Sequence, residues 1–101
     1  MAMHVISRSA LRAFWKIHPE AEQPLRDWYS VVKNATWATP NDMRETFNSV
    51  DLVGRCSVFN VGGNRYRIVA AVHFNSRRVY IRHVLSHREY DREKWKPECE
   101  A

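Results

Sequence analysis

Residues 55–85 read RCSVFNVGGNRYRIVAAVHFNSRRVYIRHVL, and this stretch decides the fold. Apolar and polar side chains alternate along it with a period of two, which is typical of β-strands. Gly62-Gly63-Asn64 and Asn75-Ser76 interrupt the alternation with residue types that favour tight turns. The pattern therefore predicts an antiparallel meander of three strands, at about Arg55–Val61, Arg65–Phe74 and Arg77–Leu85.

The residues around this meander predict helices and one further strand. Helical periodicity, prolines and capping residues indicate where each helix begins and ends. The expected elements are a strand at Met3–Ser7, helices at about Arg8–His18, Pro24–Ala35 and Pro40–Phe47, and a last short helix that follows Ser86. We therefore predict an α+β fold in which an αα-hairpin packs on one face of a small antiparallel sheet. The chain is expected to form one domain over residues 1–101, with a frayed tail at about 94–101.

Strand alternation assigns each side chain to one face of the sheet. On the middle strand, the apolar face that should pack under the helices carries Tyr66, Ile68, Ala70, Val72 and Phe74. The other face carries Arg65, Arg67, Val69, Ala71 and His73. On the last strand, Val79, Ile81, His83 and Leu85 alternate with Tyr80, Arg82 and Val84. This assignment predicts Arg67 and Arg82 side by side, where they would repel each other unless an anion lies between them. Acidic partners from the helices are the alternative.

Charge is distributed very unevenly along the chain. No Asp or Glu occurs in the 37 residues from Leu52 to Arg88, which contain seven arginines and no lysine. The formal net charge of +5 arises entirely after residue 51. Because the planar guanidinium matches the geometry of phosphate, nucleic acid is a favoured partner for this segment. A solvated arginine-rich face is the alternative that charge alone leaves open.

Composition limits the cellular setting and the cofactors. No apolar run approaches the roughly 20 residues that span a bilayer, and no export leader is recognisable, so we expect a cytoplasmic protein without a membrane segment. Cys56 and Cys99 form neither a disulfide framework nor a metal-binding pattern. Cys56 is predicted to be a buried strand residue and Cys99 a thiol in the frayed tail. The chain also lacks the carboxylate cluster that a two-metal nuclease requires, so we expect no metal or cofactor.

The segment after the last strand carries two candidates for proton transfer. His87 and Tyr90 are three residues apart, which places them one turn apart on the same face of a helix. An imidazole can accept or donate a proton near neutral pH, and a phenol can donate one or orient a substrate. A capping or surface role for His87 is the alternative. His73 and His83 are weaker candidates, because each is predicted in mid-strand.

Two blocks of sequence resemble the HigB toxins of type II toxin–antitoxin systems. They are Phe59-Asn60-Val61-Gly62-Gly63-Asn64-Arg65-Tyr66-Arg67 and Tyr80-Ile81-Arg82-His83-Val84-Leu85-Ser86-His87-Arg88-Glu89-Tyr90-Asp91. The resemblance extends over nearly the whole chain and implies a RelE-like fold. It also implies an endoribonuclease that cleaves mRNA on the ribosome without a metal, through attack by the RNA 2′-OH. The implied partners are mRNA, the ribosome and a HigA-like helix-turn-helix antitoxin.

The family chemistry needs cations around the phosphate and groups that move protons, and the matching residues here are Arg67, Arg82, His87 and Tyr90. The sheet lacks the lysine on which several RelE-like proteins rely, so the assignment of base and acid between His87 and Tyr90 stays open. Further RNA contacts are expected from basic, polar and aromatic side chains of the same segment, namely Asn64, Arg65, His73, Arg77, Arg78, Tyr80 and Arg88.

Two other functions compete with cleavage. One is a non-catalytic RNA- or ribosome-binding module, which would usually display aromatic side chains for base stacking. Most strand aromatics here are predicted on the core face, with Tyr80 the main exception, and this favours cleavage. The other is a plain structural domain, which would leave the acid-free stretch unexplained.

Overall fold

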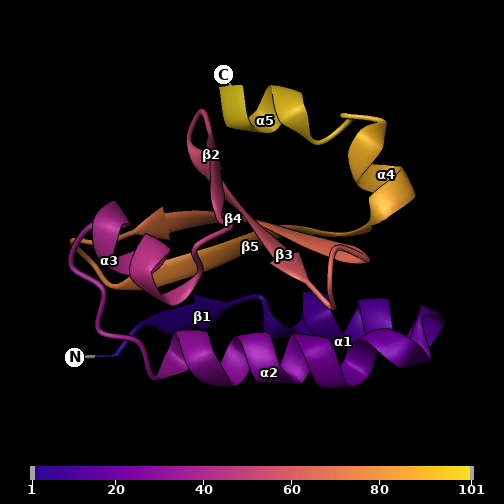
Figure 1. Ribbon diagram of the computed structural model, residues 1–101, viewed down its shortest axis with the longest axis horizontal. Coiled ribbons are helices and arrows are strands. Elements are labelled where there is room, and N and C mark those ends of the chain that lie inside the picture. Colours follow the sequence, from indigo (N-terminus) through magenta and orange to yellow (C-terminus); the bar gives the residue numbers. More distant parts are fainter. Residues whose placement is uncertain (1, 101) are drawn as a thin grey trace.

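The computed structural model describes residues 2–100 and contains one five-stranded sheet in the order β1-β5-β4-β3-β2. The strands are β1 His4–Ile6, β2 Asp51–Val53, β3 Cys56–Val61, β4 Tyr66–His73 and β5 Arg78–Ser86. The helices are α1 Arg8–Ile17, α2 Glu22–Lys33, α3 Pro40–Thr46, α4 His87–Asp91 and α5 Lys96–Glu100, with a 3-10 turn at Pro19–Ala21. Figure 1 shows the α1–α2 hairpin below the sheet and α4 and α5 above it.

The sheet confirms the predicted α+β class and the antiparallel meander of β3, β4 and β5. Its one parallel pairing joins β1 to β5, and the remaining pairings are antiparallel. β2 is a short edge strand that the sequence pattern did not predict. None of the helices in residues 2–100 has the length and apolar character needed to cross a membrane.

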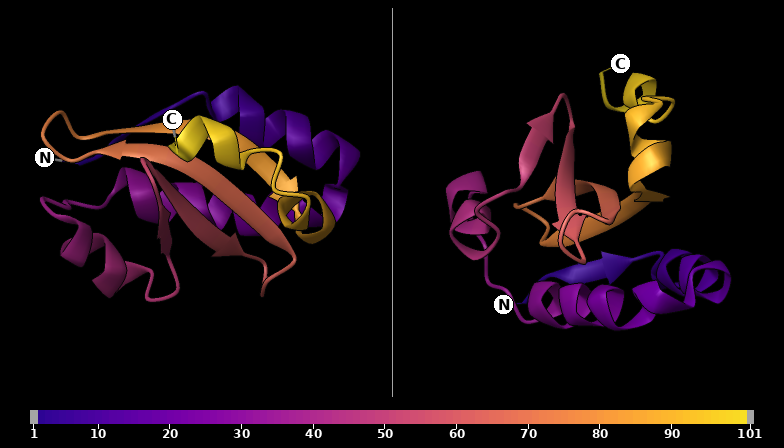
Figure 2. Two further views of the ribbon diagram at one scale, coloured as in Figure 1. Left: turned by 90° about the horizontal axis from the view of Figure 1, so that it is seen from above. Right: turned by 45° about the vertical axis from the view of Figure 1, so that its right-hand side comes forward.

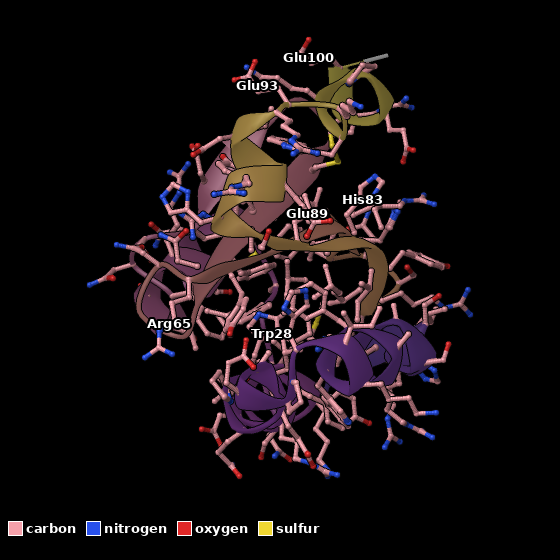
Figure 3. All side chains as sticks on the ribbon, turned by 90° about the vertical axis from the view of Figure 1, so that its right-hand side faces the viewer. Trp28, Arg65, His83, Glu89, Glu93 and Glu100 are labelled. Carbon is pink, nitrogen blue, oxygen red and sulfur yellow. A yellow bond between two sulfur atoms is a disulfide. The ribbon has the colours of Figure 1, made fainter. Side chains whose placement is uncertain are left out.

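The first face of the sheet packs against the helical hairpin, as predicted. Leu25, Trp28 and Val32 lie one turn apart on α2 and are buried against this face. The Trp28 ring meets the Phe59 ring of β3 edge-on, with centroids 5.3 Å apart. Figure 3 shows Trp28 between the hairpin and the sheet. The sequence pattern predicted this apolar layer, and its burial stabilises the fold.

Helix α4 begins immediately where β5 ends, and a capping box fixes that junction. Ser86 Oγ accepts a hydrogen bond from the backbone N–H of Glu89 at 3.2 Å, and Glu89 Oε1 accepts one from the backbone N–H of Ser86 at 2.9 Å. The His87 N–H also donates to the carbonyl of Arg65, at 2.9 Å. The start of α4 is thereby tied to the turn between β3 and β4, and both predicted proton-transfer residues lie beside that turn.

A β-bulge corrects the predicted alternation on β5. Val69 pairs with His83, but the next residue, Ala70, pairs with Ile81, so Arg82 is an extra residue on β5. A bulge of this kind reverses the faces of the residues beyond it. The side chain of Val84 therefore packs in the core under the hairpin, whereas His83 and Leu85 lie on the opposite face.

The C-terminal residues cover that opposite face, which we call the second face and define by Arg67, Val69, Ala71 and His73 of β4. Helices therefore lie on both faces of the sheet, and the prediction of a frayed tail at about 94–101 is wrong for residues 94–100, while residue 101 lies outside the described residues. Trp95 and Cys99 are buried against this face, in a second apolar cluster that includes Val58 and Val69. Figure 2 (right) shows α4 and α5 on the side away from the hairpin. Pro97 does not prevent α5, because it lies in the first helical turn.

A disulfide between Cys56 of β3 and Cys99 of α5 is the second correction, since both were predicted to be unpaired. Their Cα atoms are 5.2 Å apart although the two cysteines are 43 positions apart in sequence. The same helix also docks through its backbone, because the N–H of Arg55 donates to the carbonyl of Cys99 at 2.8 Å. A Cβ on Gly54 would overlap that carbonyl, so the turn between β2 and β3 accommodates α5 only with glycine there.

Candidate catalytic site and nucleic-acid interface

Arg67 and Tyr90 are in contact where the second face meets α4. The Arg67 guanidinium carbon lies 5.1 Å from the centre of the Tyr90 ring, which is a cation–π distance. Arg67 comes from β4 and Tyr90 from α4, so the contact depends on the capping box that begins α4 at the end of β5. The structure thus brings together two of the four residues predicted to be catalytic.

Arg67 is held rigidly but retains unused donors. The residue is only 9% exposed, and its Nη1 donates to the carbonyls of Asn64 at 2.9 Å and Tyr66 at 3.1 Å. No carboxylate in residues 2–100 forms a salt bridge with it. Among residues 2–100, Trp28 Nε1 is the one fully enclosed side-chain nitrogen or oxygen atom without a hydrogen-bond partner. The remaining N–H groups of Arg67 are therefore not enclosed, and they reach the surface. A cation that is nearly buried and lacks a counter-ion is suited to bind an anion.

Tyr90 lies in an apolar and charged environment that keeps its phenol protonated. Its ring stacks on Trp95 with centroids 4.9 Å apart, and Trp95 Nε1 donates to the Tyr90 carbonyl at 2.9 Å. Burial raises the pKa of the Tyr90 phenol; the negative charge of Asp51 adds to the rise, and the Arg67 guanidinium opposes it. At neutral pH the phenol is therefore a hydrogen-bond and proton donor rather than a base.

His87 lies one turn before Tyr90 and is exposed to solvent. Its Nδ1 is 2.9 Å from Asp91 Oδ2, one turn further along α4. A carboxylate at Nδ1 favours the tautomer with the proton on that nitrogen, which leaves Nε2 as an acceptor. The arrangement can therefore support a base at His87, with Asp91 as its positioning residue.

Arg82 is not beside Arg67, so the predicted two-arginine cradle does not form. The register pairs Arg67 with Leu85, three residues beyond Arg82, which is roughly 10 Å along a strand. Trp95 and Cys99 pack on the second face over Val69, in the region between the two arginines. Arg82 instead lines a separate pocket with Arg55 and His73.

The predicted RNA-binding residues divide into two groups. Near Arg67 and Tyr90 lie Asn64 and Arg65 of the β3–β4 turn and Arg88 of α4, all of them exposed. Near the β4–β5 turn, at the other end of the sheet, lie His73, Arg77, Arg78 and Tyr80. In this second group the rings of His73 and Tyr80 are 5.2 Å apart, and Arg78 Nη1 donates to the Tyr80 hydroxyl at 3.4 Å.

Sequence reasoning missed the residues that the C-terminal segment contributes. Trp95 stacks on Tyr90, and the positive charge of Lys96 acts on the Tyr90 phenol. A lysine therefore lies near the site although the sheet contains none. The spacing of Trp95 and Cys99, one helical turn apart, was the available signal of an apolar face. Residues 2–100 contain no group of three His, Cys, Asp or Glu side chains placed to hold a metal ion.

Comparison with known proteins gives the same family as the sequence blocks. A family described as "HigB_toxin, RelE-like toxic component of a toxin-antitoxin system" matches residues 21–93. This chain belongs to the HigB toxin family.

Individual relatives are similar over most of their length. The chain is 35% identical over 92 residues to "mRNA interferase toxin HigB" of Escherichia coli K12, covering 88% of each protein. It is 31% identical over 93 residues to "mRNA interferase HigB" of Escherichia coli O6:H1 strain CFT073, covering 89% of this chain and 90% of that protein. The match to "mRNA interferase HigB" of Shigella flexneri is also 35% identical over 92 residues. The family match includes both Arg67 and Tyr90.

Proposed function

We propose that this protein is the endoribonuclease toxin of a toxin–antitoxin system and cleaves mRNA at the Arg67–Tyr90 contact. The observation that carries the proposal is the Arg67 guanidinium, which is nearly buried, stacked on Tyr90 and without a carboxylate partner in residues 2–100. Membership in the HigB toxin family and the relatives named mRNA interferase support RNA as the substrate.

The reaction proposed is transesterification within the RNA. The 2′ oxygen attacks the adjacent phosphorus while His87 Nε2 accepts its proton, and the bond from phosphorus to the 5′ oxygen breaks. Tyr90 donates a proton or hydrogen bond to that leaving oxygen, and the products are a 2′,3′-cyclic phosphate and a 5′-hydroxyl. Arg67 stabilises the negative charge that develops on the phosphate oxygens. The scheme balances without a metal ion.

The partners follow from the same proposal. A toxin of this family has an antitoxin, and we propose one of the HigA-like helix-turn-helix type. We also propose that the mRNA is cleaved while it is bound to the ribosome. An acidic antitoxin surface would complement the +5 charge of the chain, and it would either cover the site or make the toxin too bulky for the ribosome.

A cleavage assay distinguishes this proposal from non-catalytic RNA binding. Purified protein and a defined mRNA are incubated with EDTA, with and without ribosomes, and the product ends are identified by mass spectrometry. Cleavage with 5′-hydroxyl ends is expected in at least one of the two arms. Ends carrying a 5′-phosphate, or activity that returns only with Mg²⁺, would indicate a different class of nuclease. RNA that is bound but intact in both arms would favour the non-catalytic module.

A further inference from the structure

A second basic pocket lies on the second face, away from the Arg67–Tyr90 contact. It has a volume of about 340 Å³, and its lining includes Arg55, His73 and Arg82 together with one acid, Glu98. These residues come from four elements, because Arg55 lies between β2 and β3, His73 ends β4, Arg82 is in β5 and Glu98 is in α5. The pocket is therefore a product of the folded chain and not of one basic segment.

The β-bulge is the feature that places Arg82 in this pocket. As the extra residue opposite the Val69–Ala70 step, Arg82 lines the pocket beside Ala71. The next residue, His83, lies 3.2 Å from Glu98 Oε2 through its Nε2. The bulge thus separates two basic neighbours: Arg82 faces the pocket, and His83 meets the acid of α5. Bulges are frequently found where a side chain is redirected toward a functional site.

The two arginines of the pocket lack a counter-charge of their own. Within residues 2–100 neither Arg55 nor Arg82 forms a salt bridge, since Glu98 is paired with His83. The guanidinium carbon of Arg82 is 6.0 Å from the centre of the Tyr80 ring, and the His73 ring meets the same tyrosine. Like charges that converge on a hollow are stabilised by an anion placed between them, and the guanidinium fork favours phosphate oxygens.

We infer that this pocket binds a backbone phosphate of the RNA substrate, at a nucleotide other than the one that is cleaved. The inference rests on the proposed function for the identity of the RNA, but the pocket itself contributes to binding and not to bond breaking. Glu98 is then an internal anion that weakens the attraction for phosphate and limits affinity. The chain would then hold RNA at two points, the Arg67–Tyr90 contact and this pocket. The C-terminal segment lies between them, because Trp95 stacks on Tyr90 and Glu98 lines the pocket.

Binding of an uncleavable RNA tests the pocket separately from catalysis. The probe is a fluorescent single-stranded 2′-O-methyl RNA oligonucleotide, and its Kd is measured by anisotropy over a series of salt concentrations. Arg55→Ala and Arg82→Ala should each weaken binding about tenfold, as expected for one charge-assisted hydrogen bond. Removal of both arginines should reduce the salt slope by about 0.7, the value for one phosphate of a single strand. Each single variant should reduce the slope by less, because the remaining arginine still contacts the same phosphate.

Two further variants complete the test. Glu98→Gln should tighten binding, because it removes the internal negative charge while keeping the side-chain shape. Arg44→Ala removes an exposed arginine of α3 that does not line the pocket, and should bind like the wild type. Arg55 and Arg82 variants that match Arg44→Ala, or a Glu98→Gln variant that binds more weakly, would overturn the inference. The inference would also fail if the Arg55 and Arg82 variants bound a polyglutamate peptide more weakly than the wild type but bound RNA equally well. That result would assign the pocket to an acidic protein segment.

The outcome separates this inference from the proposed function. If RNA binding depends on Arg55 and Arg82 but the wild type cleaves no RNA, the pocket stands and the nuclease proposal fails. If the wild type cleaves RNA and neither arginine affects Kd, KM or the salt slope, the pocket is refuted and the nuclease proposal stands. If the wild type cleaves RNA, the Arg55 and Arg82 variants should have a higher KM than the wild type, and their rates at saturating enzyme should be close to normal.

Discussion

Removing the Cys56–Cys99 disulfide should cost the protein a large part of its stability. The bond closes a loop with a sequence separation of 43 residues. Loop-closure entropy for that length corresponds to about 4 kcal/mol of the free energy of unfolding. Domains of this size are stable by only about 5–15 kcal/mol in total, so reduction should produce an easily measured change.

Urea unfolding of the oxidised and the reduced protein measures this effect on a single sequence. With an m-value near 2 kcal/mol/M, a loss of about 4 kcal/mol lowers the unfolding midpoint by about 2 M. Cys99→Ala is the control, because its midpoint should be low and should not respond to reductant. A midpoint that changes by less than about 0.3 M on reduction, or two free thiols in the native protein under non-reducing conditions, would refute the reasoning.

The same experiment reports on the candidate site. Trp95 lies four residues before Cys99 and stacks on Tyr90, so loss of the disulfide should loosen that contact. The Arg55–Cys99 backbone hydrogen bond and the close approach at Gly54 remain after reduction, so α5 should stay partly docked. We therefore expect faster hydrogen exchange in α5 and a change in tryptophan fluorescence as Trp95 becomes more exposed, while the hairpin and sheet remain folded.

Three further outcomes are expected. His87→Gln should lower RNA cleavage more than Tyr90→Phe, because the base is lost in the first case and a donor that water can partly replace in the second; equal losses would make Tyr90 an essential proton carrier. The hydrogen bond from the backbone N–H of Ser86 lowers the pKa of Glu89 below its ordinary value of 4.5. The stability that this contact provides is therefore complete above pH 4.5, and it is lost as the pH falls through the lowered pKa of the folded protein. Acid unfolding of Glu89→Gln should accordingly show a smaller pH dependence than that of the wild type. Association with the antitoxin should slow as salt rises; a rate constant unchanged between low and high salt would contradict a charge-driven interface.

The sequence was sufficient for the elements whose signals are local. The turn at Gly62-Gly63-Asn64 and the capping boxes at Thr39 and Ser86 each depend on residues within four positions of one another, so the meander, α3 and α4 were predicted with small errors in their ends. The buried face of α2 was recognisable from its helical period for the same reason.

Features that depend on distant partners could not be predicted in this way. The bulge at Arg82 inserts one residue into an otherwise regular alternation, and nothing in the local pattern marks its position. The burial of Trp95 and Cys99 depends on a surface formed 26 or more residues earlier in the chain, by Val58 and Val69. The family resemblance assigned Arg67 and Tyr90 to one site, but their contact, the separation of Arg82 from Arg67 and the covering of the second face were not predicted.

The cleavage rate of an Arg67 variant tests the central claim most directly. Single-turnover cleavage of one defined mRNA is compared for the wild type, Arg67→Ala, Arg67→Lys and the control Arg44→Ala, each first shown to be folded by its unfolding midpoint. Loss of a preorganised donor to the developing charge predicts a rate roughly 10²–10³ lower for Arg67→Ala. Arg67→Lys should lie between that variant and the wild type, because it keeps the charge but loses the fork. A folded Arg67→Ala protein that cleaves as fast as Arg44→Ala would contradict the placement of the site at the Arg67–Tyr90 contact.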